Sequence, residues 1–293
     1  MKFRYVMILC LILLMLCGCT VKNKAPDIAA STLPVYEFTS RICQGTDLTV
    51  SKLITENVSC LHDYSLQVNQ MRMIEGSDVV ILSGAGLEEF MEDALQKARF
   101  TIDASEGIPL VCGHHAEESS IQIHDHGHES DPHIWLSPAN AIEMALNIHA
   151  GLLLLYPEHK ATFDVNLSQL LTDLTTLQEY GQETLADLDC RNIITFHDGF
   201  GYLAKEYALN ILEAVEEESG SEASASEIIH LINLVNDYQL PGVFTEINGS
   251  TAAASIIAAE TDVKCQALDM ALSGESYFDA MYYNFDCLRE VLQ

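Results

Sequence analysis

The chain has 293 residues, 48% of them hydrophobic and 8% aromatic, which argues against global disorder and allows two domains with cores of their own. Its 14 Lys and Arg stand against 43 Asp and Glu, a formal net charge of −29 at pH 7. So acidic a chain argues against nucleic acid as a partner, because phosphate binding needs basic patches. The excess suits a protein that attracts cations, and a solubilising acidic surface explains it equally well.

The amino-terminal stretch is typical of an export signal rather than of the fold. Lys2 and Arg4 precede the apolar run YVMILCLILLMLC, which is too short and wrongly flanked for a spanning helix. The run ends in LCGC, which resembles the bacterial lipobox, so we expect residues 1–18 to be removed and Cys19 to carry a lipid anchor. A plain signal peptide or a buried helix is the alternative. We expect the rest to be soluble and tethered at the extracytoplasmic face of the cell membrane.

Six cysteines lie beyond Cys19, and an even number in an exported protein permits disulfides. No CxxC pair occurs, so spacing gives no support for a cysteine zinc site. Three fall in each half of the chain, which predicts that some are free buried thiols. The pairing stays open for Cys43, Cys60, Cys112, Cys190, Cys265 and Cys287.

Strand and helix patterns alternate along the first half of the chain. The stretch DVVILSG is almost continuously apolar, as expected for a strand covered on both faces of a parallel sheet. The alternation predicts parallel strands with right-handed crossovers. The expected strands are 27–32, 47–54, 78–84 and 99–105, and the expected helices are 35–44, 69–77 and 87–98.

A second alternating series begins near Asn192. Ser224 and Glu227 in its second helix have the spacing of a capping box. Together the two series predict an α/β fold of two similar parallel-sheet lobes. The expected strands of the second lobe are 192–197, 242–247 and 263–269, and its helices are 200–208, 223–238, 250–260 and 277–292.

Between the lobes, apolar residues recur at steps of three and four from Phe163 to Leu177, which predicts one face of a long, rigid α-helix. Such a rod limits how far two lobes can hinge. The predicted division is a lipoprotein signal peptide at 1–18, an amino-terminal lobe at 19–156 with a His-rich loop at 112–131, a bridging helix at 157–188 and a carboxyl-terminal lobe at 189–293.

Four residues stand where a parallel α/β sheet binds ligands, near the carboxyl ends of strands. His62 follows the strand that ends near Ile54, His197 ends NIITFH, and Asp269 ends VKCQALD. His133 lies in DPHIWLSP, where two prolines restrict the backbone. Three imidazoles and one carboxylate suit zinc, whereas calcium or magnesium prefers mostly oxygen. Taken singly, each of these residues is as readily explained as a core, surface or capping residue.

Several of these segments together resemble one protein family. They are similar, in this order, to segments of the solute-binding lipoproteins of bacterial zinc/manganese ABC transporters, the ZnuA/TroA-like family: GSDVVILSGAGLEEF, DPHIWLSP, FHDGFGYLAKEY, and VFTEINGS with LDMALSG. The resemblance implies a metal site in the cleft between two lobes and delivery of the ion to a membrane ABC permease. It implies the metal ligands His62, His133, His197 and Asp269.

The chain also departs from the family's pattern. CLHDYSLQVNQ replaces the family's PHxYEPS-like first motif, and Met270 stands where the family often has proline. Manganese-preferring members tend to carry Glu at the third ligand position, so His197 favours Zn²⁺, with an Mn²⁺-specific protein as the alternative. The His-rich loop implies weak auxiliary metal binding, although a solvated insertion explains it equally well. Its histidines are His114, His115, His124, His126 and His128.

Two other functions compete with capture of the ion. A zinc hydrolase needs an open coordination position and a base, for which Glu246 or Glu275 could serve, but the chain has no HExxH motif and four protein ligands would close the site. We therefore expect no enzyme. A role in cell adhesion on the same scaffold is compatible with the sequence. We expect a monomer held at the membrane by its lipid anchor.

Overall fold

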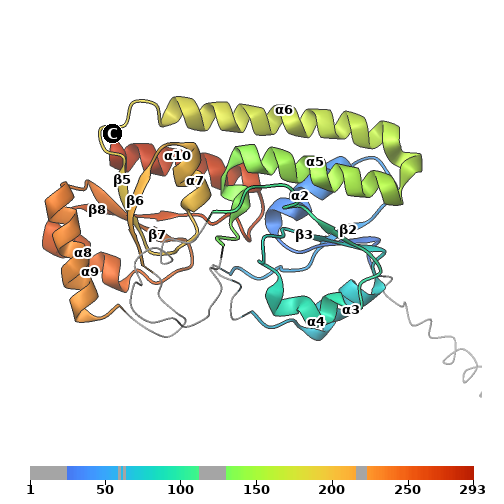
Figure 1. The fold of residues 1–293 in the computed structure, drawn as a ribbon, viewed down its shortest axis with the longest axis horizontal. Helices are drawn as coiled ribbons and strands as arrows, with labels where there is room; N and C mark the ends of the chain where they lie inside the picture. The colour runs from blue at the N-terminus through green and yellow to red at the C-terminus, as the bar shows by residue number, and fades with distance from the viewer. Residues whose placement is uncertain (1–24, 59–60, 62–63, 112–129, 216–222) are drawn as a thin grey trace, which may run out of the picture.

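The computed structural model describes residues 25–58, 61, 64–111, 130–215 and 223–293. It contains two four-stranded sheets, and all of their strands run parallel (Figure 1). The strand order is β2-β1-β3-β4 in the first sheet and β6-β5-β7-β8 in the second. Both orders place the first strand of the lobe inside the sheet, with later strands added on both sides of it. Each sheet therefore has a topological switch point, where the order of the strands reverses. The predicted α/β fold of two parallel-sheet lobes is confirmed.

In the amino-terminal lobe, buried strands alternate with helices. The central strands β1 and β3 are almost completely buried, in keeping with their apolar sequence. The elements are β1 (Ile28–Ala30), α2 (Leu33–Ile42), β2 (Val50–Lys52), α3 (Val68–Gly76), β3 (Val79–Leu82), the 3₁₀ turn η1 (Glu89–Met91), α4 (Glu92–Leu95), β4 (Thr101–Asp103), the 3₁₀ turn η3 (Ile134–Leu136) and α5 (Pro138–Leu155).

The carboxyl-terminal lobe repeats this construction. Its second helix begins with the predicted capping box. The Ser224 hydroxyl accepts from the Glu227 backbone N–H, and the Glu227 carboxylate accepts from the Ser224 backbone N–H. The elements are β5 (Asn192–Thr195), α7 (Gly201–Glu206), β6 (Asn210–Ala214), α8 (Ala225–Tyr238), β7 (Gly242–Glu246), α9 (Ala252–Thr261), β8 (Lys264–Leu268) and α10 (Tyr277–Leu292).

A long helix, α6 (Lys160–Thr184), joins the lobes after the 3₁₀ turn η4 (Pro157–His159). It lies over α5 and α10 along the top of both lobes in Figure 1. Its buried face is formed by Phe163, Leu167, Leu170, Leu174, Leu177 and Gly181. One hydrophobic core runs from β1 through α5 and α6 to α10, so the lobes share a core on this side. A shared, close-packed core limits hinge motion more strongly than a bridging helix alone would.

The structure differs from the sequence predictions in three places. β6 was not predicted, because NILEA at 210–214 carries an exposed Asn and a Glu that interrupt its apolar pattern. The helix predicted at 87–98 is only the short pair η1 and α4, since Glu88 turns inward to bind the preceding loop. The bridging helix has 25 residues and does not fill the predicted range 157–188, because η4 precedes it and the helix ends at Thr184.

Among the described residues, no single helix is long and apolar enough to cross a membrane. α5 and the helix that follows it meet the criteria of length and composition only when taken together, and they are bent by 117°. The four described cysteines, Cys43, Cys190, Cys265 and Cys287, are free thiols, and Cys43 and Cys287 are buried as predicted. Cys19, Cys60 and Cys112 lie outside the described residues.

Candidate metal centre

His133 is held by the short, proline-flanked segment before η3. Its side chain is only 3% exposed. The Asp131 Oδ1 accepts a hydrogen bond from the His133 backbone N–H at 2.8 Å and lies 2.9 Å from the His133 Nδ1. A carboxylate at this position favours the tautomer with the proton on Nδ1, because that nitrogen can then donate to it. The Nε2 of His133 is thereby left as the nitrogen that can bind a metal ion.

His197 follows β5 and faces His133 from the other lobe. The two Nε2 atoms are 3.4 Å apart, and the ring planes are inclined at 82°. On its other side, the His197 Nδ1 lies 3.5 Å from Oε2 of Glu246, a buried residue at the end of β7. Each imidazole therefore has a carboxylate behind Nδ1 and turns Nε2 toward the other. This is the arrangement that a pair of metal-binding histidines requires.

A glycine makes room for the two rings. A Cβ placed on Gly199 would lie 2.7 Å from the His197 ring, 2.7 Å from the Met270 methyl carbon and 2.8 Å from Nδ1 of His133. No side chain larger than hydrogen fits there without moving these groups. The same contacts place Met270, the residue after the fourth predicted ligand, directly beside the histidine pair.

Asp269 follows β8 and directly precedes Met270 in the chain. It lines a cavity of about 180 Å³ together with residues of both lobes, among them Asn57, Asn248 and Ser273. Its Oδ1 accepts a hydrogen bond from the Ala271 backbone N–H at 2.8 Å, and burial raises the pKa of its carboxyl. Asn284 holds the Asp269 main chain through two hydrogen bonds of 2.7 Å. The backbone of this ligand candidate is thus fixed, and its side chain caps its own loop.

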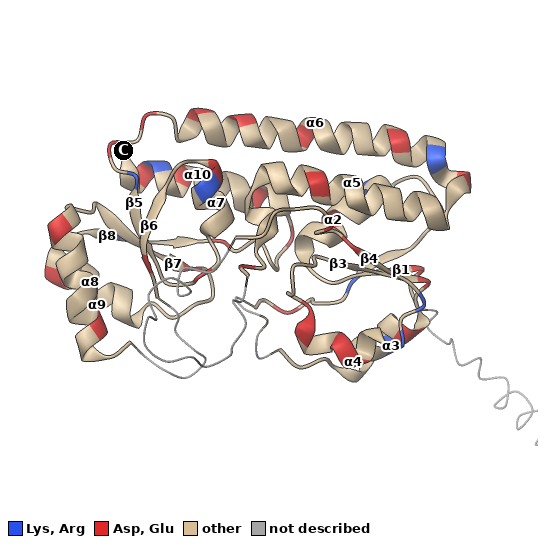
Figure 2. Ribbon diagram, viewed as in Figure 1, with Lys and Arg blue, Asp and Glu red and all other residues tan. Residues whose placement is uncertain are grey.

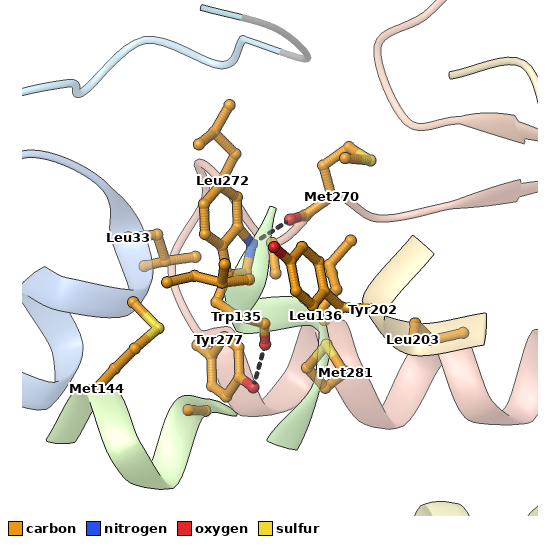
Figure 3. Packing of buried hydrophobic residues seen from close by; sticks show 14 of the residues in the cluster. Leu33, Trp135, Leu136, Met144, Tyr202, Leu203, Met270, Leu272, Tyr277 and Met281 are labelled. Carbon is orange, nitrogen blue, oxygen red and sulfur yellow. Dashed lines mark hydrogen bonds between the residues drawn. The ribbon is translucent and has the colours of Figure 1, made fainter. Parts of the chain in front are cut away.

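The loop after Asp269 is tied to the amino-terminal lobe. The Trp135 indole N–H donates to the Met270 carbonyl at 2.7 Å (Figure 3). The Leu33 backbone N–H donates to the Leu272 carbonyl at 3.1 Å. The Tyr277 hydroxyl in turn donates to the Trp135 carbonyl at 2.7 Å. Asp269 therefore belongs by sequence to one lobe, while its loop is anchored to the other.

The structure thus brings together His133 and His197. Asp269 lies next in the chain to Met270, in a cavity whose lining does not include the two histidines. Among the described residues, no three His, Cys, Asp or Glu side chains are grouped closely enough to hold a metal ion. His62 lies outside the described residues, as do His114, His115, His124, His126 and His128. The sequence predictions missed Asp131, although its position two residues before His133 in DPHIW could have indicated it, and they considered Glu246 only as a possible hydrolase base.

Comparison with known families agrees with this geometry. Residues 28–291 match the family model ZnuA, described as the periplasmic component A of a zinc-uptake complex. The chain belongs to the ZnuA family. The match covers both lobes and the helix between them, so the whole described fold is that of the family.

Individual relatives are distant in sequence and close in structure. The chain is 29% identical over 297 residues to the zinc-binding lipoprotein AdcA of Streptococcus pneumoniae, covering 94% of this chain and 58% of that protein. It therefore spans little more than half the length of that relative. With the high-affinity zinc uptake system protein ZnuA of Bacillus subtilis it shares 27% identity over 309 residues, covering 98% and 96%.

Two solved structures give the same picture. A crystal structure of ZnuA superposes with a TM-score of 0.79 at 26% identity, covering 92% of this chain and 100% of that one. The Zn(II)-bound AdcA from Streptococcus pneumoniae superposes with a TM-score of 0.76 at 27% identity, covering 91% of this chain and 57% of that one. The names of these relatives describe zinc binding for AdcA and zinc uptake for the Bacillus subtilis ZnuA.

Proposed function

We propose that this protein captures Zn²⁺ in the cleft between its lobes and delivers it to a membrane ABC permease for import. The observation that carries the proposal is the facing pair His133 and His197, with Nε2 atoms 3.4 Å apart and a carboxylate behind each Nδ1. The names of relatives such as AdcA and ZnuA, which describe zinc binding and zinc uptake, support it.

The distance between the two nitrogens fits a tetrahedral zinc site. Zn–N bonds of about 2.0–2.1 Å meeting at a tetrahedral angle place two nitrogens about 3.3–3.4 Å apart. The observed separation of the Nε2 atoms is 3.4 Å. His197 at the third ligand position, and the zinc named for relatives such as AdcA and ZnuA, favour Zn²⁺ over Mn²⁺ as the captured ion.

His62 and Asp269 complete the proposed site. Asp269 offers its carboxylate from a main chain that Asn284 already fixes. A cation in the cleft also offsets the burial that raises the pKa of the Asp269 carboxyl, since an opposite charge favours the ionised form. Four protein ligands close a tetrahedral site and leave no position for a reactive water, so the proposed role is capture without turnover.

The proposed place of action is the extracytoplasmic face of the cell membrane. Cys19 carries the lipid anchor in this proposal, and the protein works as a monomer that meets its permease at the membrane. The cleft closes little on binding, because the shared core resists separation of the lobes.

Isothermal titration with Zn²⁺ tests the proposal directly. We expect His133→Ala to lose the tight site, whereas His230→Ala, a histidine on the exposed surface of α8, keeps it. Undiminished affinity in His133→Ala would overturn the assignment. Competition between Zn²⁺ and Mn²⁺ on the unaltered protein decides the preference for the ion.

Deletion of residues 114–128 tests the division between the tight site and the His-rich loop. We expect the tight site to survive and the weaker additional sites to disappear, because single exposed imidazoles bind metal only transiently. Loss of tight binding together with the loop would show that the loop supplies a ligand.

A further inference from the structure

The described chain begins near the amino ends of the strands of the amino-terminal sheet, away from the candidate metal centre. Ala25 packs against Gly76 at the end of α3, where an added Cβ would lie 2.5 Å from the Ala25 Cβ. Asp78 N–H donates to the Asp27 carbonyl at 2.8 Å just before β1 and β3 begin. The chain thus enters at the amino ends of these strands, whereas the metal centre lies beyond the carboxyl ends of strands.

Two large apolar side chains are exposed at this same end. α5 runs antiparallel to β4, since Asn147 donates to the Ala104 carbonyl at 2.9 Å and Gly151 packs against Ile102. Toward the carboxyl end of α5 and the amino end of β4, the same alignment brings the last turn of α5 beside Phe100. Phe100 is 58% exposed, and Leu154 in that last turn is 85% exposed. Phe100 and Leu154 are called the apolar tip of the lobe. A single exposed apolar residue is common on protein surfaces, whereas two at the same end form a small apolar patch.

This end carries charges of both signs with a small acidic excess, whereas the chain as a whole carries −29. Lys97, Arg99 and Lys160 are exposed here, and Figure 2 shows the basic residue at this end of α6. Several acidic residues nearby are in ion pairs, while Glu75 and Glu158 are exposed. The pairs are Arg99 with Asp78 at 2.6 Å, Lys160 with Asp164 at 2.8 Å and His159 with Asp47 at 3.3 Å.

The connection to the proposed lipid anchor is short. Six residues lead from Cys19 to Ala25, and two of them are Lys22 and Lys24. Fully extended, six residues reach roughly 20 Å. Basic residues beside an anchor are attracted to the anionic lipids of a membrane surface. A strongly acidic molecule held so close to an anionic surface is repelled less through an end whose acidic residues are partly paired with basic ones than through an end whose acidic residues are unpaired.

We infer that this end of the amino-terminal lobe, with Phe100 and Leu154 at its tip, rests on the lipid bilayer to which Cys19 is anchored. The inference rests on the lipid anchor of the proposed function. The anchor supplies the affinity, and the tip sets the orientation. In this orientation the metal cleft is directed away from the lipid surface and stays open to the solution from which Zn²⁺ is captured.

Fluorescence of two single-tryptophan substitutions tests this orientation. The lipidated full-length mature chain carrying Phe100→Trp is reconstituted into vesicles of phosphatidylcholine and phosphatidylglycerol with brominated acyl chains. The matched control is Ile229→Trp on α8, which is 60% exposed at the far end of the other lobe. Trp135 is fully buried and contributes the same background to both proteins. Zn²⁺ titration of the same vesicles records whether the metal site is intact.

We expect the Phe100→Trp protein to lose emission and to shift its maximum to the blue, and Leu154→Trp to behave alike, while Ile229→Trp is unaffected. Equal quenching at Phe100 and Ile229, or none at either, would overturn the inference. A chain that does not float with the vesicles disproves the anchor, and the orientation with it. A chain that floats and binds Zn²⁺ but is not quenched at Phe100 disproves the orientation alone.

Discussion

A single carboxylate oxygen of Asp131 holds both the main chain and the ring of His133. Its Oδ1 accepts from the His133 N–H at 2.8 Å and lies 2.9 Å from the His133 Nδ1. The Oδ2 atom of Asp131 is buried and makes no hydrogen bond with the described residues. Such a carboxylate fixes the orientation of the imidazole before any ion binds. The loss of side-chain entropy therefore occurs on folding and does not weaken metal binding.

Replacing Asp131 by Ala should therefore weaken Zn²⁺ binding although no metal ligand is lost. We expect a decrease in affinity of about 10- to 100-fold, the usual effect of removing the partner of a metal-binding histidine. Titration against a chromophoric zinc chelator measures it. Asp93→Ala, an exposed carboxylate in the first turn of α4, is the control. Equal affinities in both variants would mean that the Asp131 contact is structural only.

Gly199 offers a second test of how tightly the site is built. In Gly199→Ala the new methyl group meets His197, Met270 and His133 at 2.7–2.8 Å, so the two rings must separate and Zn²⁺ affinity should fall at least tenfold. Gly151→Ala is a matched control, because its Cβ would meet Ile102 at 2.6 Å, far from the cleft. We expect Gly151→Ala to lower the melting temperature and to leave Zn²⁺ affinity unchanged. A similar loss of affinity in both variants would contradict this account.

The sequence predicted the architecture and the surroundings of His133 and His197 more completely than it predicted their partners. Strongly periodic segments such as 223–238 became helices with the expected cap, because local pattern and packing agree there. β6 escaped notice because an exposed Asn and a Glu interrupt the apolar pattern of NILEA at 210–214, so that its side chains do not resemble those of the buried strands. The role of Glu246 depends on β5 and β7 being neighbours in the sheet, and strand order cannot be read from spacing.

The contacts of the Asp269 loop show the same limit. Trp135 and Leu33 bind this loop from positions 135 and 239 residues away in the sequence, and no local pattern records such pairs. Predicted ligands can thus be placed at strand ends by a general rule for α/β folds. Which of them meet, and what holds them, depends on tertiary packing.

Glu88 predicts a dependence of stability on pH. Its carboxylate accepts hydrogen bonds from Ser31, Ser83 and Gly84, yet burial dominates and raises its pKa to about 7. Because the folded pKa lies above that of the unfolded chain, the folded protein binds the extra proton between about pH 4.5 and 7. The stabilisation is complete below this window and is lost as the pH rises through about 7.

Glu88→Gln, which cannot ionise, isolates this effect. We expect the free energy of unfolding of the unaltered protein to fall relative to that of the variant by up to about 3 kcal/mol between pH 4.5 and 7.5. Urea unfolding at several pH values, with zinc removed by a chelator, measures the difference. A constant difference across this range would show that the three hydrogen bonds hold the pKa of Glu88 near its ordinary value.

Trp135 predicts a link between stability and metal binding. In Trp135→Phe the Met270 carbonyl loses its buried donor, which costs about 1–3 kcal/mol, and the smaller ring leaves additional space. The loop that carries Asp269 is then less firmly fixed, so Zn²⁺ affinity should fall together with the free energy of unfolding. Tyr277→Phe is the control, because it removes a hydrogen bond of the same length to the Trp135 carbonyl without touching Met270. We expect it to lower stability by a similar amount and to keep Zn²⁺ affinity. If both variants bind Zn²⁺ as the unaltered protein does, the anchoring of this loop does not matter for the site.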